Sequence, residues 1–221
     1  DIVGDRRGVN IADFALDDQR RLLECAIEAM TGAGAPRPTA FRAGNYGANN
    51  DTLKALAALG LDYDSSYNRP YAGESCRIDV DAPLNAPAAL EGVIEVPITY
   101  FEDYPSHTRA LQLCASSTAE LQAVVRQSLA QERPTVVIVN HSFELLSLKR
   151  TRANRMLLKR FDEYCGFLQA HRSELKSRGF GDLGRVVRQE SRPQKPLTSN
   201  PMRTALRMIE QSVGTYLYDR A

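Results

Sequence analysis

The stretch Pro38–Leu53 reads PTAFRAGNYGANNDTL and places a permanent positive charge directly after an apolar run. The run, Thr39–Phe41, predicts a short buried strand, and Arg42 follows it. A guanidinium beside a core strand needs a carboxylate or carbonyl partner, because burying it unpaired costs too much free energy. Gly44 and Gly47 come next, and we expect them to let the backbone turn tightly and approach a ligand closely.

Helical and extended patterns alternate along the rest of the chain. We expect helices over Asp17–Met30, from a cap at Asn50 or Asp51 to Gly60, after the capping box Ser117–Glu120, and over Arg152–Leu175. Extended patterns are the segment after Leu61, Gly92–Phe101 with Pro97 as an edge or bulge, and Thr135–Val139. The last of these, TVVIV, is continuously apolar, as a parallel strand covered on both faces should be. The alternation predicts an α/β fold built on a parallel sheet or barrel.

Composition limits the classes of partner. The 221 residues suit one large domain, or one domain with an extension, and the formal net charge of +1 gives no reason to expect nucleic acid or an anionic membrane as partner. No apolar run is long enough to span a bilayer. The four cysteines show no C-x-x-C spacing and are interpreted as separate buried thiols. The sequence does not fix the compartment, but such thiols favour a reducing, cytoplasmic one.

The composition changes near the C-terminus. Residues 191–200, within SRPQKPLTSNP, are predicted to be a linker, and residues 201–221 a final helix with Asn200 as its cap. Its apolar side carries Met202, Leu206, Ile209, Val213 and Leu217. This helix could bind a membrane surface or a partner, but packing back on the domain is favoured.

Two polar residues stand at the ends of predicted strands, where α/β folds gather their chemistry. His141 follows Thr135–Val139 and could act as a general acid or base, or could be a structural histidine bonded to a carbonyl. Arg42 could orient a catalytic carboxylate, or form an ion pair that holds a loop. Asp62 and Asp64 are paired acids that form a solvated face or, in the lesser alternative, contribute one residue to the site. His107 has no evident partner.

Several site types are excluded by missing patterns. There is no H-x-x-x-H or H-x-x-E-H spacing, so no metal site is predicted within this chain. The GNYG segment lacks the further residues of a phosphate-binding loop, and no nucleophile elbow is present.

Three segments together resemble a known family. AFRAGNYGANNDTLKALAALGLDYDSSYN, VIEVPITYF and VVIVNHSFELL are similar, in order and spacing, to the latter part of a polysaccharide deacetylase domain of carbohydrate esterase family four. The resemblance covers roughly residues 16–171 and implies an incomplete (β/α) barrel that removes N-acetyl groups from a polysaccharide or amino sugar. It also implies a divalent metal, usually zinc, held by two histidines and one aspartate of an Asp-Asp pair, with the other aspartate as general base. This chain does not contain these motifs.

The resemblance implies a role for each candidate. Arg42 would keep a catalytic aspartate ionised, and His141 would protonate the leaving amine. A backbone N–H near Asn45 would bind the oxyanion, and Val139 would line the pocket for the acetyl methyl. Asn45 stands where the family's tyrosine is expected, with Tyr46 one step later, and Asp64 is the candidate for the acid of its Asp-Trp motif.

The departures from the family pattern concern both single residues and whole motifs. Ala43 and Gly44 replace common prolines, and the chain contains no tryptophan. Because the chain begins at Asp1, just before the helix that leads into the arginine motif, we expect an N-terminally truncated deacetylase domain over residues 1–190, lacking the first strands. Such a piece should not bind zinc tightly or turn over substrate unaided. The alternatives are a carbohydrate-binding pseudoenzyme and an unrelated α/β interaction module.

Overall fold

The computed structural model describes residues 3–4, 7–183 and 195–219. The chain divides into two compact units, unit 1 with residues 1–98 and 178–193, and unit 2 with residues 99–177 and 194–221. The described residues contain five α-helices and two small sheets, with no closed barrel among them. The structure is therefore mixed α/β, and the incomplete barrel stays a prediction.

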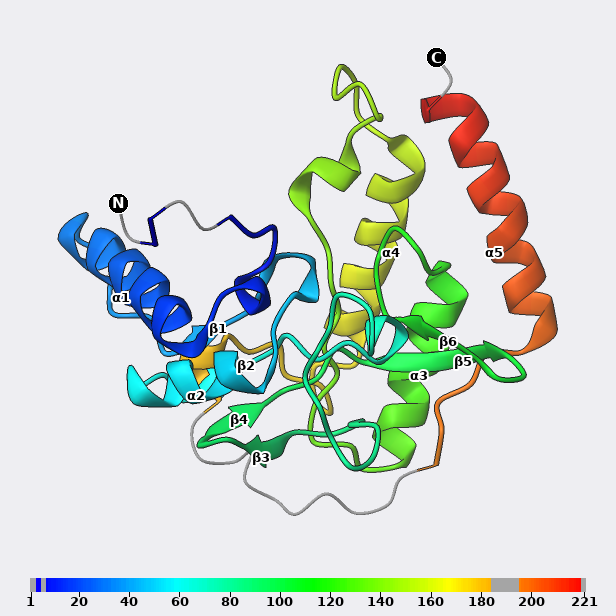
Figure 1. Ribbon diagram of the computed structural model, residues 1–221. Coiled ribbons are helices and arrows are strands. Elements are labelled where there is room, and N and C mark those ends of the chain that lie inside the picture. Colours follow the sequence, from blue (N-terminus) through cyan, green and yellow to red (C-terminus); the bar gives the residue numbers. More distant parts are fainter. Residues whose placement is uncertain (1–2, 5–6, 184–194, 220–221) are drawn as a thin grey trace. The chain divides into compact units, whose positions relative to one another are not determined.

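Unit 1 is built around a four-stranded sheet in the order β1-β2-β4-β3. Its strands are β1 (Ala40–Phe41), β2 (Tyr63–Asp64), β3 (Ala88–Leu90) and β4 (Val93–Glu95). β1, β2 and β4 run parallel, and β3 pairs antiparallel with β4. The helices α1 (Leu16–Gly32) and α2 (Asn50–Ala58) pack against each other (Figure 1). The predicted strand at Thr39–Phe41 and both helices are confirmed.

Local sequence explains the bounds of these helices. α2 is capped by Asn49, whose side chain accepts a hydrogen bond from the Thr52 amide, so the predicted cap at Asn50 or Asp51 was one or two residues late. Gly60 ends this helix with a φ of 74°, as expected of a residue at C′. On α1 the buried apolar residues are Leu23 and Ile27, whereas Met30, near the end of the helix, is half exposed.

Pro97 divides the extended segment Gly92–Phe101 instead of forming an edge or bulge within one strand. The amides on both sides still bond to the β2 segment: Val96 donates to the Asp64 carbonyl at 2.7 Å and Ile98 donates to the Tyr67 carbonyl at 2.9 Å. Pro97 has no N–H, so the ladder is interrupted there. The segment supplies β4 to one sheet and β5 to the other, and the boundary between the units follows Ile98.

Unit 2 consists of a β-hairpin and three helices. The hairpin pairs β5 (Tyr100–Tyr104) with β6 (His107–Ala110), and the helices are α3 (Thr118–Ala130), α4 (Arg155–Ala170) and α5 (Pro201–Gly214). α5 continues as a π-helical segment, Thr215–Asp219. Phe101, Leu111, Leu121, Val124 and Phe167 are among the core residues. The predicted capping box of α3 is confirmed, because Ser117 and Glu120 bond to each other's amides.

The segment Thr135–Val139, the strongest strand prediction, is not a regular strand. It is extended, but its single ladder contact is an isolated parallel bridge between Val139 and Gln112. The amide of Val137 donates to the hydroxyl of Thr99 instead of a backbone carbonyl, which interrupts the ladder. Of its five residues only Val139 is fully buried, so the segment is not covered on both faces.

The long helices of unit 2 differ from expectation in length or in the face that they bury. α4 is shorter than the predicted Arg152–Leu175, and it buries Arg160, Tyr164 and Phe167 while Leu158 and Phe161 stay exposed. α5 has the predicted cap, since Asn200 accepts from the Arg203 amide. It does pack on its unit, but through polar residues. The predicted linker falls partly outside the described residues; within the described part, Leu197 is buried and Thr198 bridges to Glu102.

Two smaller expectations can also be compared with the structure. The cysteines are free, but only Cys76 is buried and Cys165 is exposed, so the prediction of four buried thiols was wrong. None of the helices in the described part of the chain combines the length and apolarity needed to cross a bilayer.

The loop after β1 turns at unexpected residues. Asn45 and Tyr46 take the left-handed conformation, with φ values of 54° and 56°, although neither is glycine. Gly44 has open space around it, so the prediction that it makes the tight turn was wrong. Gly47 is required for another reason: a Cβ there would lie 2.3 Å from Cγ of Asn10.

We predict that Gly47→Ala lowers the free energy of unfolding by about 1–3 kcal/mol, because the new methyl group collides with Asn10. Gly44→Ala is the matched control in the same loop, and its stability should stay within about 1 kcal/mol of wild type. Urea unfolding followed by circular dichroism measures both. Equal stability of the two variants would contradict the role assigned to Gly47.

Candidate functional site

Three parallel strands of unit 1 end in a row of polar groups. The register pairs Phe41 of β1 with Asp64 of β2, and Asp64 with Glu95 of β4. Residues in register on neighbouring strands point to the same face, so the two carboxyl groups lie side by side. Arg42 comes one residue beyond the row. The carboxyl edge of the sheet therefore carries two acids and a cation, as the positions of active sites in α/β folds would suggest.

The two carboxyl groups are completely buried, each with 0% exposure. Asp64 accepts from Ser66 twice, from its hydroxyl at 2.8 Å and its amide at 3.0 Å. Glu95 Oε1 accepts from the Tyr67 amide at 3.0 Å. Burial, followed by the nearby Asp64 carboxylate, raises the pKa of Glu95 well above its ordinary value. Asp64 is therefore a buried residue of the carboxyl edge and does not belong to a solvated face.

Glu95 Oε2 is buried, and it forms no hydrogen bond to a donor group among the described residues. Two carboxylate oxygens cannot bond to each other unless one carries a proton. A protonated Glu95 resolves this, because its hydroxyl can donate to Asp64. We therefore assign the neutral acid to Glu95 and the charge of the pair to Asp64.

Arg42 is held by the residue that follows β2. Its Nε donates to the Ser65 carbonyl at 3.0 Å and its Nη2 to the Ser65 hydroxyl at 2.9 Å, while that hydroxyl donates to the Val96 carbonyl. Burial lowers the pKa of Arg42, and the charges of Tyr46, Asp64 and Glu95 act in the opposite direction. The group remains a cation at neutral pH. These bonds hold a loop in place, but neither is to a carboxylate, so the ion pair of the structural alternative is not formed among the described residues.

The loop that follows Arg42 carries the other two predicted site residues of unit 1, Asn45 and Tyr46. Asn45 is exposed, and its amide lies 3.5 Å from the Asn10 side chain. The Tyr46 ring packs against Tyr71 with centroids 5.3 Å apart. Two successive left-handed residues cost roughly 1–2 kcal/mol each, and such strain is concentrated at functional sites.

Asn68 was not singled out from the sequence, although it follows the same strand. It is fully buried, and neither its Nδ2 nor its Oδ1 has a hydrogen-bond partner among the described groups. Buried polar groups are rarely left in this state. Glu95 was also missed, because VIEVPITYF has the alternation of an ordinary strand. The one available signal was an acid at an inward position of that strand.

The remaining predicted residues belong to unit 2. Val139 is buried, and its backbone bonds to Leu111 and Leu113. His141 is half exposed, with its Nδ1 lying 3.2 Å from Glu144 Oε1, and the same oxygen accepts from Gln112. An ionised carboxylate can only accept, so Nδ1 carries the proton and Nε2 is the nitrogen left for a substrate. His141 therefore has a carboxylate partner, not the backbone carbonyl of the structural alternative.

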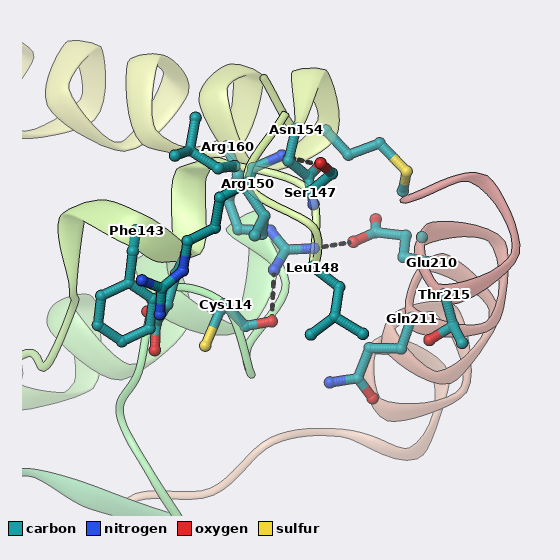
Figure 2. Close-up of a pocket in the computed structure, with 15 residues that line it drawn as sticks. Cys114, Phe143, Ser147, Leu148, Arg150, Asn154, Arg160, Glu210, Gln211 and Thr215 are labelled. Atoms are coloured by element: carbon teal, nitrogen blue, oxygen red, sulfur yellow. Dashed lines mark hydrogen bonds and ion pairs between the residues drawn. The ribbon is translucent and has the colours of Figure 1, made fainter. Parts of the chain in front are cut away.

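A cavity of about 570 Å³ in unit 2 lies between the start of α4, the segment around Phe143–Leu148 and α5 (Figure 2). Arg160 lies at its wall and donates to the Cys114 carbonyl and to Glu210. Burial, followed by Glu144, raises the pKa of the Cys114 thiol to about 12, so this thiol is not a nucleophile at neutral pH. Neither Val139 nor His141 lines the cavity.

The structure thus brings together Arg42 and Asp64 at one sheet edge, with Asn45 and Tyr46 in the adjoining loop. Val139 and His141 belong to the other unit, and a cavity common to all six residues stays a prediction. In the described ranges, no three His, Cys, Asp or Glu side chains gather closely enough to hold a metal ion. Zinc, the cofactor that the resemblance implies, stays a prediction for the complete protein.

Comparisons of the chain with protein-family models, with curated proteins and with solved structures found no match.

The buried pair of Asp64 and Glu95 predicts how the stability of the protein depends on pH. The pKa of Glu95 is raised above the unfolded value of about 4.3, so the folded protein binds more protons than the unfolded chain between these two values. Wild-type stability should then fall as the pH rises through that window. Glu95→Gln removes this titration, so the free energy of unfolding of the variant minus that of wild type should increase by up to about 1.4 kcal/mol per pH unit.

The measurement is urea unfolding between about pH 4 and pH 8, a range set by the unfolded pKa. Glu74→Gln, at an exposed position of unit 1, is the control and should follow wild type at every pH. Parallel curves for wild type and Glu95→Gln would show that Glu95 is not held protonated.

Proposed function

We propose that this chain is part of a metal-dependent deacetylase that removes N-acetyl groups from an acetylated polysaccharide or amino sugar. The observation that supports this best is the carboxyl edge of unit 1, where Arg42 is held beside the buried pair Asp64 and Glu95. The three segments that resemble polysaccharide deacetylases contain the residues of this edge and His141.

Arg42 has a defined task in the proposed reaction. Its Nε and Nη2 are bonded to Ser65, which fixes the plane of the guanidinium. A fixed cation at a strand end can hold a carboxylate in its ionised form and orient it toward the reacting water. Against the lowering effect of burial, the nearby Asp64 acts to raise the pKa of Arg42.

His141 would act as the proton donor. The leaving amine of an amide must be protonated as the C–N bond breaks, and an imidazole can supply that proton near neutral pH. Glu144 accepts from Nδ1, which orients the ring and leaves Nε2 for the transfer. Asn45 and Tyr46 would contact the sugar or the oxyanion, and Val139 would limit the acyl pocket.

Zinc would supply a polarised acetyl carbonyl and an activated water. Under this proposal its ligands belong to a part of the protein outside these 221 residues, so the activity belongs to the whole protein. Acetylated carbohydrate is the proposed partner, and no nucleic acid is proposed. The finding that no described helix is long and apolar enough to span a membrane does not depend on the proposal.

We predict that Arg42→Ala and His141→Ala each lower kcat by about 100-fold or more in the protein encoded by the whole reading frame, since positioned acid–base groups contribute about that much. Acetate release from an acetylated chito-oligosaccharide, with Zn²⁺ supplied, is the measurement. Arg69→Ala and His171→Ala replace residues of the same types outside the proposed site and should keep wild-type rates.

Circular dichroism separates a loss of folding from a loss of chemistry. A wild-type rate in Arg42→Ala or His141→Ala would remove that residue from the mechanism. Binding of the oligosaccharide by the wild-type protein without any acetate release would favour the carbohydrate-binding alternative and overturn the proposal.

A further inference from the structure

α5 packs on unit 2 through its polar side. Thr204 donates to the Asp103 carbonyl at 3.0 Å, and Gln211 donates to the Ala115 carbonyl at 3.3 Å. Between them, Arg207 donates to Asp103 Oδ2 at 2.7 Å and to Glu120 at 3.2 Å. These three residues are spaced by three and four positions and so share one face of the helix.

This attachment is buried and specific. Arg207, Asp103 and Glu120 are each at most 2% exposed. Asp103 also accepts from His107, which opens β6 and so has the partner that the sequence did not reveal, and from Arg109. Burial alone would raise the pKa of Asp103, but these hydrogen bonds outweigh it and lower the pKa. Rotating α5 about its axis would leave buried charges unpaired, at a cost of several kcal/mol.

The opposite face of α5 is apolar and open to solvent. Met202, Leu206, Ile209 and Val213 are 74%, 52%, 61% and 44% exposed. Their spacing of four, three and four residues is the a/d pattern of a helix that pairs with another helix. In Figure 1, α5 (red) forms an outer side of unit 2. A fixed polar attachment and an unpaired heptad face together form a surface for a helical partner.

We propose that this face is covered by α5 of a second copy of the chain, in antiparallel orientation. With a twofold axis midway between Leu206 and Ile209, Leu206 meets Ile209 of the second copy and Met202 meets its Val213. Arg203 and Glu210, one heptad apart beside the apolar stripe, then face each other across the axis. Glu210 Oε2 already accepts from Arg160 within unit 2, so each of the two symmetric ion pairs uses the other oxygen of the Glu210 carboxylate. The charge pattern is self-complementary only in the antiparallel arrangement.

The other flank of the stripe also fits a close helix partner. Ala205 and Ser212 are exposed and small, and they face each other across the same axis. The Ser212 hydroxyl already donates to the Met208 carbonyl at 2.9 Å, so burying it does not leave its donor unpaired. α5 is only about 21 Å long, but its attachment to unit 2 has already ordered it, which lowers the entropy cost of pairing.

An anionic membrane surface fits this helix less well. Interfacial helices carry many Lys and Arg residues on their polar face. Over the described part of α5 and its extension, 201–219, the basic residues are Arg203 and Arg207, and Arg207 is buried in ion pairs. The interface therefore favours a protein partner, independently of the proposed deacetylase activity.

Analytical ultracentrifugation tests the proposal. The wild-type chain should sediment as a species of twice 24.5 kDa. Ile209→Asp places a charge in the apolar stripe and should weaken dimerisation by about 100-fold or more. Met208→Asp is the matched control: Met208 is 59% exposed on the same helix but lies off the stripe, so this variant should remain dimeric. A monomeric wild type, or equal dissociation of the two variants, would overturn the proposal.

Charge exchange tests the antiparallel orientation. Arg203→Glu and Glu210→Lys should each weaken the homodimer, because like charges meet twice. Glu210→Lys also removes the partner of Arg160, so Glu210→Gln, which loses the same ion pair without adding a positive charge, is its control. A mixture of the two variants should form a heterodimer of near wild-type affinity, since both pairs are then of opposite sign. Failure of the mixture to dimerise, with each variant folded by circular dichroism, would overturn the orientation. Binding of a monomeric wild type to anionic vesicles would instead assign the face to lipid.

Discussion

Two carboxyl groups buried side by side cannot both be ionised, and this constraint organises the carboxyl edge of unit 1. The register between β2 and β4 sets Asp64 against Glu95, and burial removes the water that would screen two negative charges. One proton on Glu95 leaves a single charge on Asp64, which Ser66 stabilises through two hydrogen bonds. The cation of Arg42 then lies beside one negative charge, and the edge carries a fixed, nearly balanced set of polar groups.

The sequence predicted the individual elements of this edge, but it did not predict which distant residues meet there. Arg42 after an apolar run, the helix from Asn50 and Gly60 at its end follow from local rules, because capping and strand patterns extend over only a few residues. Glu95 lies 31 positions from Asp64, and only the strand register brings them together. The left-handed turn at Asn45 and Tyr46 was assigned to the glycines instead, since glycine adopts such conformations at lower cost.

The same limit explains the two largest errors in unit 2. TVVIV has the composition of a central strand, but a single hydroxyl, that of Thr99, takes the place of a ladder carbonyl. α5 has the predicted bounds and an apolar stripe, and such a stripe normally faces the core. Here Asp103 and Glu120, about a hundred residues earlier in the chain, bind Arg207 and turn the polar side inward. Helical periodicity shows that two faces exist, but buried charges decide which one is covered.

The Arg207 cluster and the carboxyl edge of unit 1 differ in how fully their buried polar groups are hydrogen-bonded. Around Arg207, every carboxylate oxygen of Asp103 and Glu120 has a hydrogen-bond donor, as a purely structural cluster requires. At the carboxyl edge of unit 1, both polar atoms of the Asn68 side chain lack such partners among the described residues, and Glu95 must carry a proton to satisfy its second oxygen. Each such group costs roughly 1–3 kcal/mol and contributes nothing to stability. A strained loop and unsatisfied polar groups at the same strand ends are more readily explained by a binding or catalytic role than by folding alone.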